Sequence, residues 1–156
     1  MVLVDRVVAI DPGVSIVGLK AISGGEACYR DVAAGLGRER HAYPVSLMLE
    51  SFGQTAAILW LAGLGSSPIR DDHVLMLVAV RDCTIEGRAY PGDVLRHVAR
   101  LDQLIGDNAF VAGEILVGDR RVATIGSMMA VMRPRTVLSE RANAQDIGNR
   151  AEGDAP

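Results

Sequence analysis

The chain has 156 residues, which is enough for one domain with a hydrophobic core and too few for two domains of ordinary size. Hydrophobic residues make up 49% of it and aromatic residues only 4%, so an aliphatic core is expected. The net charge of −3, with basic residues spread along the chain, gives no indication of a nucleic-acid surface. Cys28 and Cys83 lack the spacing of a metal site or a disulfide framework, which favours a reducing cytoplasm.

The N-terminal part predicts two short extended segments. Residues 3–10 suit a short strand or a helical turn that ends at the turn Asp11-Pro12-Gly13. Residues 14–23 are rich in β-branched residues and predict a strand that ends at a pair of glycines. Residues 26–40 have no sustained period and are expected to be irregular. The first residues lack a basic region followed by a long apolar run, so no export signal is indicated.

Residues 44–62 predict one long helix. Pro44 suits the first helical turn, where its missing N–H costs nothing. Since the segment is apolar on nearly every side, we expect the helix to be enclosed. The apolar run approaches membrane-spanning length, but Glu50 and Gln54 interrupt it, and a charge at mid-bilayer costs roughly 2.5 kcal/mol or more. A buried helix in a soluble protein is therefore expected, with no membrane contact.

The second half predicts about four antiparallel strands. Residues 73–80 form a continuous apolar run typical of a strand buried on both faces. Residues 87–93 are rich in turn formers, and residues 94–105 alternate between apolar and polar. Residues 108–117 and 121–133 flank a Gly-Asp-Arg turn, a hairpin signal. The fold class is therefore α+β.

A single domain is expected over residues 1–133. Residues 134–156 are polar and poor in large apolar side chains, which predicts a disordered tail.

Three segments, residues 5–23, 44–59 and 90–132, resemble successive parts of a 3-hydroxyacyl-acyl carrier protein dehydratase. The Pro-Gly-Asp turn at residues 91–93 and the strands after it carry the clearest local likeness outside the helix. The resemblance implies the hot-dog fold, in which a curved antiparallel sheet wraps a long central helix. It covers residues 5–132.

The resemblance also implies a chemistry. In that family a histidine, in a His-Phe-Pro-Gly segment ahead of the helix, removes the proton next to the thioester carbonyl, and a helix carboxylic acid helps the 3-hydroxyl leave as water. The two groups come from opposite subunits, and N–H groups at the helix N-terminus polarise the carbonyl. Glu50 and Gln54 match the family's Glu-x-x-x-Gln, and Pro44 matches the proline that opens the helix.

The histidine of the family has no counterpart in register. The family position falls on Leu36 when counted back from Glu50, and on Val32 when counted from the N-terminal side. His41 is the one candidate replacement, displaced by five positions from Leu36. The other interpretation of His41 is an exposed loop histidine.

His73 and His97 are weaker candidates for the base. His97 alternates with apolar residues, which predicts a hydrogen-bonded histidine in the core or at an interface. The sequence contains no cluster of metal ligands and no nucleotide-binding loop, so neither a metal nor a cofactor is expected.

Three functions remain open. In the first, the chain is half of a heterodimeric dehydratase in fatty-acid or polyketide assembly, and a histidine-bearing hot-dog partner supplies the base. In the second, it is a self-sufficient homodimeric dehydratase that uses His41. In the third, it is a non-catalytic acyl-binding or assembly module. A thioesterase is a minor alternative, since fold does not fix function. Glu50 is the expected catalytic acid.

The remaining expectations concern binding. Gln54, Pro44 and Leu47 are expected to contact substrate, and the depth of the acyl tunnel is expected to depend on residues such as Leu47, Met48, Leu59 and Met76. An acidic carrier protein would meet arginine side chains. The candidates are Arg38, Arg40, Arg133 and Arg135.

Overall fold

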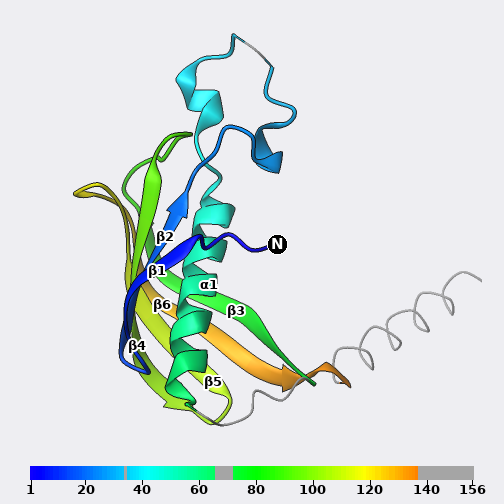
Figure 1. The fold of residues 1–156 in the computed structure, drawn as a ribbon, viewed down its shortest axis with the longest axis vertical. Coiled ribbons are helices and arrows are strands. Elements are labelled where there is room, and N and C mark those ends of the chain that lie inside the picture. Colours follow the sequence, from blue (N-terminus) through cyan, green and yellow to red (C-terminus); the bar gives the residue numbers. More distant parts are fainter. Residues whose placement is uncertain (34, 66–71, 137–156) are drawn as a thin grey trace, which may run out of the picture.

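The fold was analysed in a computed structural model that describes residues 1–33, 35–65 and 72–136. In these residues one six-stranded antiparallel sheet, ordered β1-β2-β4-β5-β6-β3, curves around one long helix (Figure 1). Two short 3₁₀ turns, Ala27–Tyr29 and Arg38–His41, lie in the segment before the helix. The elements are β1 Arg6–Asp11, β2 Ser15–Ala21, α1 Val45–Gly63, β3 His73–Ile85, β4 Val94–Ile105, β5 Asn108–Val117 and β6 Arg120–Pro134.

Helix α1 lies across the sheet and packs chiefly on β4 and β2. Its buried side chains recur at helical spacing, because only one face meets the sheet; they are Met48, Ser51, Phe52, Thr55, Ala56, Leu59 and Trp60. Gly18 of β2 allows the closest approach, since a Cβ at that position would lie 2.8 Å from Cγ2 of Thr55. The predicted arrangement of a long helix against a curved antiparallel sheet is confirmed, with Pro44 as the residue that precedes the helix.

The enclosure expected for α1 is present on one side only. The side chains of Leu47, Leu49 and Ile58 are half-buried, and Val45 is 41% exposed. Within the described residues, the stretch Arg38–Gly63 is long and apolar enough to cross a membrane, a test that the core helix of a soluble protein also passes. Within the described residues, the outward face of α1 is therefore apolar surface that is only partly covered.

The prediction that residues 73–80 are buried on both faces is wrong. Among the described residues, β3 is an edge strand that pairs only with β6, and none of its residues is fully buried. Val78 is 55% exposed and Leu77 is 41% exposed. The cause of the error is physical: an apolar run indicates that a strand avoids water, and it does not indicate whether the same chain covers it.

The predicted disordered tail, residues 134–156, falls almost wholly outside the described residues. Strand β6 ends at Pro134, one residue beyond the predicted domain boundary, and the description ends at Thr136.

Candidate functional site

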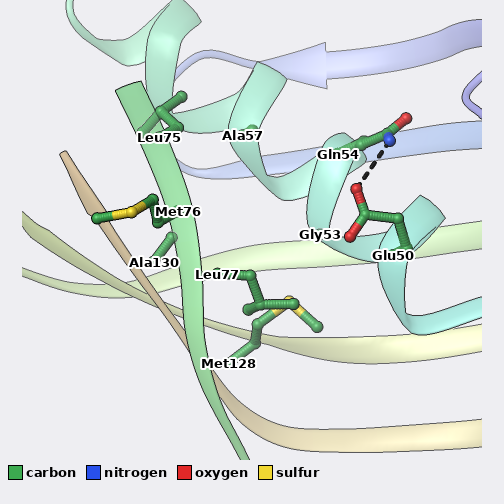
Figure 2. A pocket seen from close by; sticks show the side chains of 9 residues that line it. All are labelled: Glu50, Gly53, Gln54, Ala57, Leu75, Met76, Leu77, Met128 and Ala130. Atoms are coloured by element: carbon green, nitrogen blue, oxygen red, sulfur yellow. Dashed lines mark hydrogen bonds between the residues drawn. The ribbon is translucent and has the colours of Figure 1, made fainter. Parts of the chain in front are cut away.

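Glu50 and Gln54 lie at an apolar cleft between α1 and the strands β3 and β6. Both residues are half-buried on successive turns of α1, and Nε2 of Gln54 donates a hydrogen bond of 2.9 Å to Oε1 of Glu50. Figure 2 shows this pair on the helix, with apolar side chains of β3 and β6 opposite. The cleft has a volume of about 120 Å³ and is lined by Glu50, Gly53, Gln54, Ala57, Leu75, Met76, Leu77, Met128 and Ala130.

The lining suits an alkyl chain with one polar end. Gly53 and Ala57 have the small side chains that leave space beside the helix; a Cβ at Gly53 would lie 3.5 Å from Sδ of Met128, in ordinary contact. Beyond Glu50 and Gln54 the walls are aliphatic or thioether side chains. Such a cleft can bury an apolar chain while the carboxyl group of Glu50 meets a polar group at its end.

The start of α1 offers unpaired backbone donors. The N–H groups of Leu47 and Met48 bond to the Pro44 carbonyl at 3.0 and 3.1 Å. The N–H groups of Val45 and Ser46 have no partner in the described part of the chain. Free N–H groups at the positive end of a helix can polarise a carbonyl. Pro44 and Leu47 lie at this start and do not line the cleft next to Glu50.

A half-buried carboxylate, that of Glu26, anchors the segment before the helix. Glu26 accepts hydrogen bonds from Lys20 Nζ at 2.9 Å, from the Ser23 N–H at 2.9 Å and from the Tyr43 hydroxyl at 3.1 Å. Burial raises the pKa of Glu26, but the bonds from Lys20 and Ser23 outweigh it, so the pKa lies below its ordinary value. The ion pair between Lys20 and Glu26 thus stabilises the segment before the helix, in which the family carries its histidine.

The structure does not bring His41 to Glu50. The His41 ring stacks near Tyr29, with ring centroids 6.4 Å apart, and its Nδ1 lies 3.5 Å from the Gly37 carbonyl oxygen. Leu36 is 44% exposed in the same segment, while Val32 packs against the core. His73 lies at the start of β3, where its Nδ1 is 2.8 Å from Oδ1 of Asp72. In the described chain no imidazole lines the Glu50 cleft.

His97 is buried, but it lacks the hydrogen bonds that the sequence predicted. Its side chain on β4 is 0% exposed, and neither ring nitrogen has a partner among the described residues. The ring meets Phe52 of α1 edge-on, with centroids 6.1 Å apart. Burial lowers the pKa of His97 to about 4, so the ring is neutral at pH 7. It is a core residue and does not line the cleft.

The four arginines expected to meet a carrier protein form two separate pairs. Arg38 and Arg40 lie in the turn before α1, where the Arg38 guanidinium stacks over the Tyr90 ring at 4.2 Å. Arg133 lies at the end of β6 and Arg135 directly after it, and Nη2 of Arg133 donates to Oδ1 of Asn108 at 3.2 Å. Among the described residues, no group of three or more His, Cys, Asp or Glu side chains is placed to hold a metal ion.

Solved structures with similar folds are hot-dog proteins. One is the dehydratase heterocomplex ApeI:P from Xenorhabdus doucetiae, with a TM-score of 0.70, 17% identity, and coverage of 91% of this chain and 90% of that chain. Another is a thioesterase superfamily member from Thermus thermophilus, with a TM-score of 0.63, 15% identity, and coverage of 94% and 99%. At these identities the likeness establishes the hot-dog fold alone.

The sequence comparisons find several relatives that share the same protein name. A scan against protein-family models finds no match. The 3-hydroxyacyl-[acyl-carrier-protein] dehydratase FabZ of Acidiphilium cryptum is 36% identical over 99 residues, 63% of this chain but only 56% of that relative. The FabZ of Paracidovorax citrulli is 32% identical over 131 residues, 84% of this chain and 86% of the relative. The chain therefore belongs to the FabZ family of 3-hydroxyacyl-[acyl-carrier-protein] dehydratases.

Proposed function

We propose that this chain is one subunit of a dehydratase that removes water from 3-hydroxyacyl chains on acyl carrier protein, in fatty-acid or polyketide assembly. One observation carries the proposal: Glu50, bonded to Gln54, stands at an apolar cleft that no imidazole of the described chain lines. The cleft thus has an acid and no base. Glu50 is the catalytic acid of this half site, and the base comes from a second subunit.

The reaction divides between the two groups. The base takes the proton from C2 of the acyl chain, the C2–C3 double bond forms, and the C3–O bond breaks as Glu50 gives its proton to the departing hydroxyl, which leaves as water. The free N–H groups of Val45 and Ser46 are suited to polarise the thioester carbonyl, which stabilises the charge that develops on its oxygen. Gln54 orients Glu50.

The proposed partner is a second hot-dog subunit that carries the histidine. Two surfaces of this chain support an association: the half-buried outer face of α1 and the apolar edge strand β3. The similar fold of a protein whose name describes it as a dehydratase heterocomplex agrees with a two-chain enzyme. Cys28 and Cys83 are free thiols, in keeping with the cytoplasmic location that the proposal implies.

A homodimer that uses His41 as the base is the second candidate. Its support is that His41 is half-exposed and that its one polar contact with a described residue, the Gly37 carbonyl, is long at 3.5 Å. A side chain held this weakly can turn toward the Glu50 of another copy.

The test compares the purified chain with the same chain co-purified with a histidine-bearing hot-dog homologue, using a 3-hydroxyacyl-acyl carrier protein as substrate. We expect little dehydration by the chain alone and a large gain in the co-purified assembly, because removal of a general base costs on the order of 10²- to 10⁴-fold. His41→Ala should leave the dehydration activity of the co-purified assembly unchanged. Full activity of the chain alone, lost in His41→Ala, would establish the homodimer instead.

A further inference from the structure

The Gln54 carboxamide is held by the backbone at the start of the chain. The Leu3 N–H donates to Oε1 of Gln54 at 2.8 Å, and Nε2 of Gln54 donates to the Met1 carbonyl oxygen at 3.0 Å. The same Nε2 donates to Oε1 of Glu50 at 2.9 Å. The first three residues and the helix pair Glu50–Gln54 therefore form one hydrogen-bonded unit, and Figure 1 shows the N-terminus beside α1.

These bonds fix which way the amide points. A backbone N–H is only a donor and a backbone carbonyl only an acceptor, so Leu3 requires the amide oxygen and Met1 requires the amide nitrogen. The nitrogen has two hydrogens, and Met1 takes one of them. The second hydrogen is left for Glu50, whose Oε1 accepts it. A flipped amide would break both backbone bonds and would point its oxygen at the carboxylate.

Leu3 anchors the segment. Its side chain is only 5% exposed, whereas Met1 is 83% exposed and Val2 is 88% exposed. Burial of this leucine side chain favours the position of the short extended segment against α1. The Leu3 N–H is thereby presented to Gln54 by a residue that contacts the interior of the fold.

We propose that the N-terminal segment, residues Met1–Leu3, is a positioning element of the Glu50 site. It holds Gln54 as a donor to Oε1 of Glu50 and leaves Oε2 of Glu50, which has no hydrogen bond from the described residues, as the oxygen that exchanges a proton with the substrate. The role rests on the dehydratase function proposed above. The segment does not touch the reacting atoms; it acts through Gln54.

The test replaces one atom. Incorporating leucic acid in place of Leu3 changes the backbone N–H to an ester oxygen and leaves the buried side chain intact. The matched control is the α-hydroxy acid analogue of valine at Val4, whose N–H has no partner in the described residues. Each protein is studied co-purified with the histidine-bearing subunit for kinetics, and by itself for the side-chain amide resonances of Gln54.

We expect the Leu3 ester to lower kcat about tenfold, the effect of one oriented hydrogen bond, with KM unchanged, and to shift the Gln54 amide resonances. The Val4 ester should change neither. Equal kcat in the two esters, together with shifted Gln54 resonances, would overturn the positioning role and leave the dehydratase proposal intact. Unshifted resonances would show that the hydrogen bonds do not form, which also overturns the role. An inactive unmodified assembly would overturn the dehydratase proposal and the role with it, while the resonances would still report whether the segment binds Gln54.

Discussion

The imidazole of His97 is buried without a hydrogen-bond partner among the described residues. Its register partners on the neighbouring strands are Gly18 and Ile115, and Phe52 of α1 meets its ring edge-on. None of these carries a charge that could stabilise a protonated ring. The alternation along β4 predicted that His97 faces inward, which is confirmed, but sequence pattern could not show that the ring would lack partners, since those depend on groups from distant elements.

His97 makes stability depend on pH. Its pKa is about 4 in the fold and about 6.5 in an unfolded chain, so the unfolded state binds the extra proton between these values. The contribution is fully present above pH 6.5 and is lost as the pH falls toward 4, by about 3 kcal/mol. The free energy of unfolding, measured in urea at several pH values, should show this decrease. In His97→Leu the free energy of unfolding should depend less on pH. His73→Leu is the control; an unaltered pH slope in His97→Leu would contradict the account.

Helix α1 was the most predictable element. The helix was predicted over residues 44–62 and is observed over Val45–Gly63. Residues four apart share a helix face, which is why the side chains of Glu50 and Gln54 can contact one another. The hold of Met1 and Leu3 on Gln54 could not be predicted, because it uses backbone groups that every residue has.

The cleft beside α1 should select acyl chains by length. Ala57 lies two helical turns beyond Glu50, roughly 10 Å along the axis, so only a long chain reaches it. We expect Ala57→Leu to raise KM about tenfold for long acyl substrates and to leave short ones unchanged, measured with carrier-bound chains of graded length. Ala62→Leu makes the same change on α1 outside the cleft lining and is the matched control. An equal effect on all chain lengths would contradict the cleft as the acyl site.

Three features of the described residues fit the proposal that this chain is one half of an assembly. The outer face of α1 is half-buried, β3 is an apolar edge strand, and no imidazole of the described residues lines the Glu50 cleft. From composition alone, these apolar residues were expected to lie in the core of a single domain. A single sequence could not distinguish surface that the chain itself covers from surface that we propose a partner covers.

Two exposed valines test which edge of the sheet associates. Val78 on β3 is 55% exposed and Val8 on β1 is 50% exposed, and each lies at an irregularity of an edge strand. Val78→Lys should weaken association with the partner subunit because it places a charge in an apolar interface. Val8→Lys should have no effect. The native mass of each co-purified variant shows whether it still associates with the partner subunit. Loss of assembly in Val8→Lys alone would contradict the proposed interface.

The central claim is that this chain contributes Glu50 as the acid of a shared dehydratase site. The most direct measurement is kcat for dehydration by the co-purified assembly with Glu50→Gln in this chain, beside Glu114→Gln, which alters a carboxylate that does not line the cleft. We expect Glu50→Gln to lower kcat by on the order of 10²- to 10⁴-fold, with the assembly intact and the Glu114→Gln control unchanged. Unaltered dehydration in Glu50→Gln would contradict the account and make the chain a non-catalytic subunit.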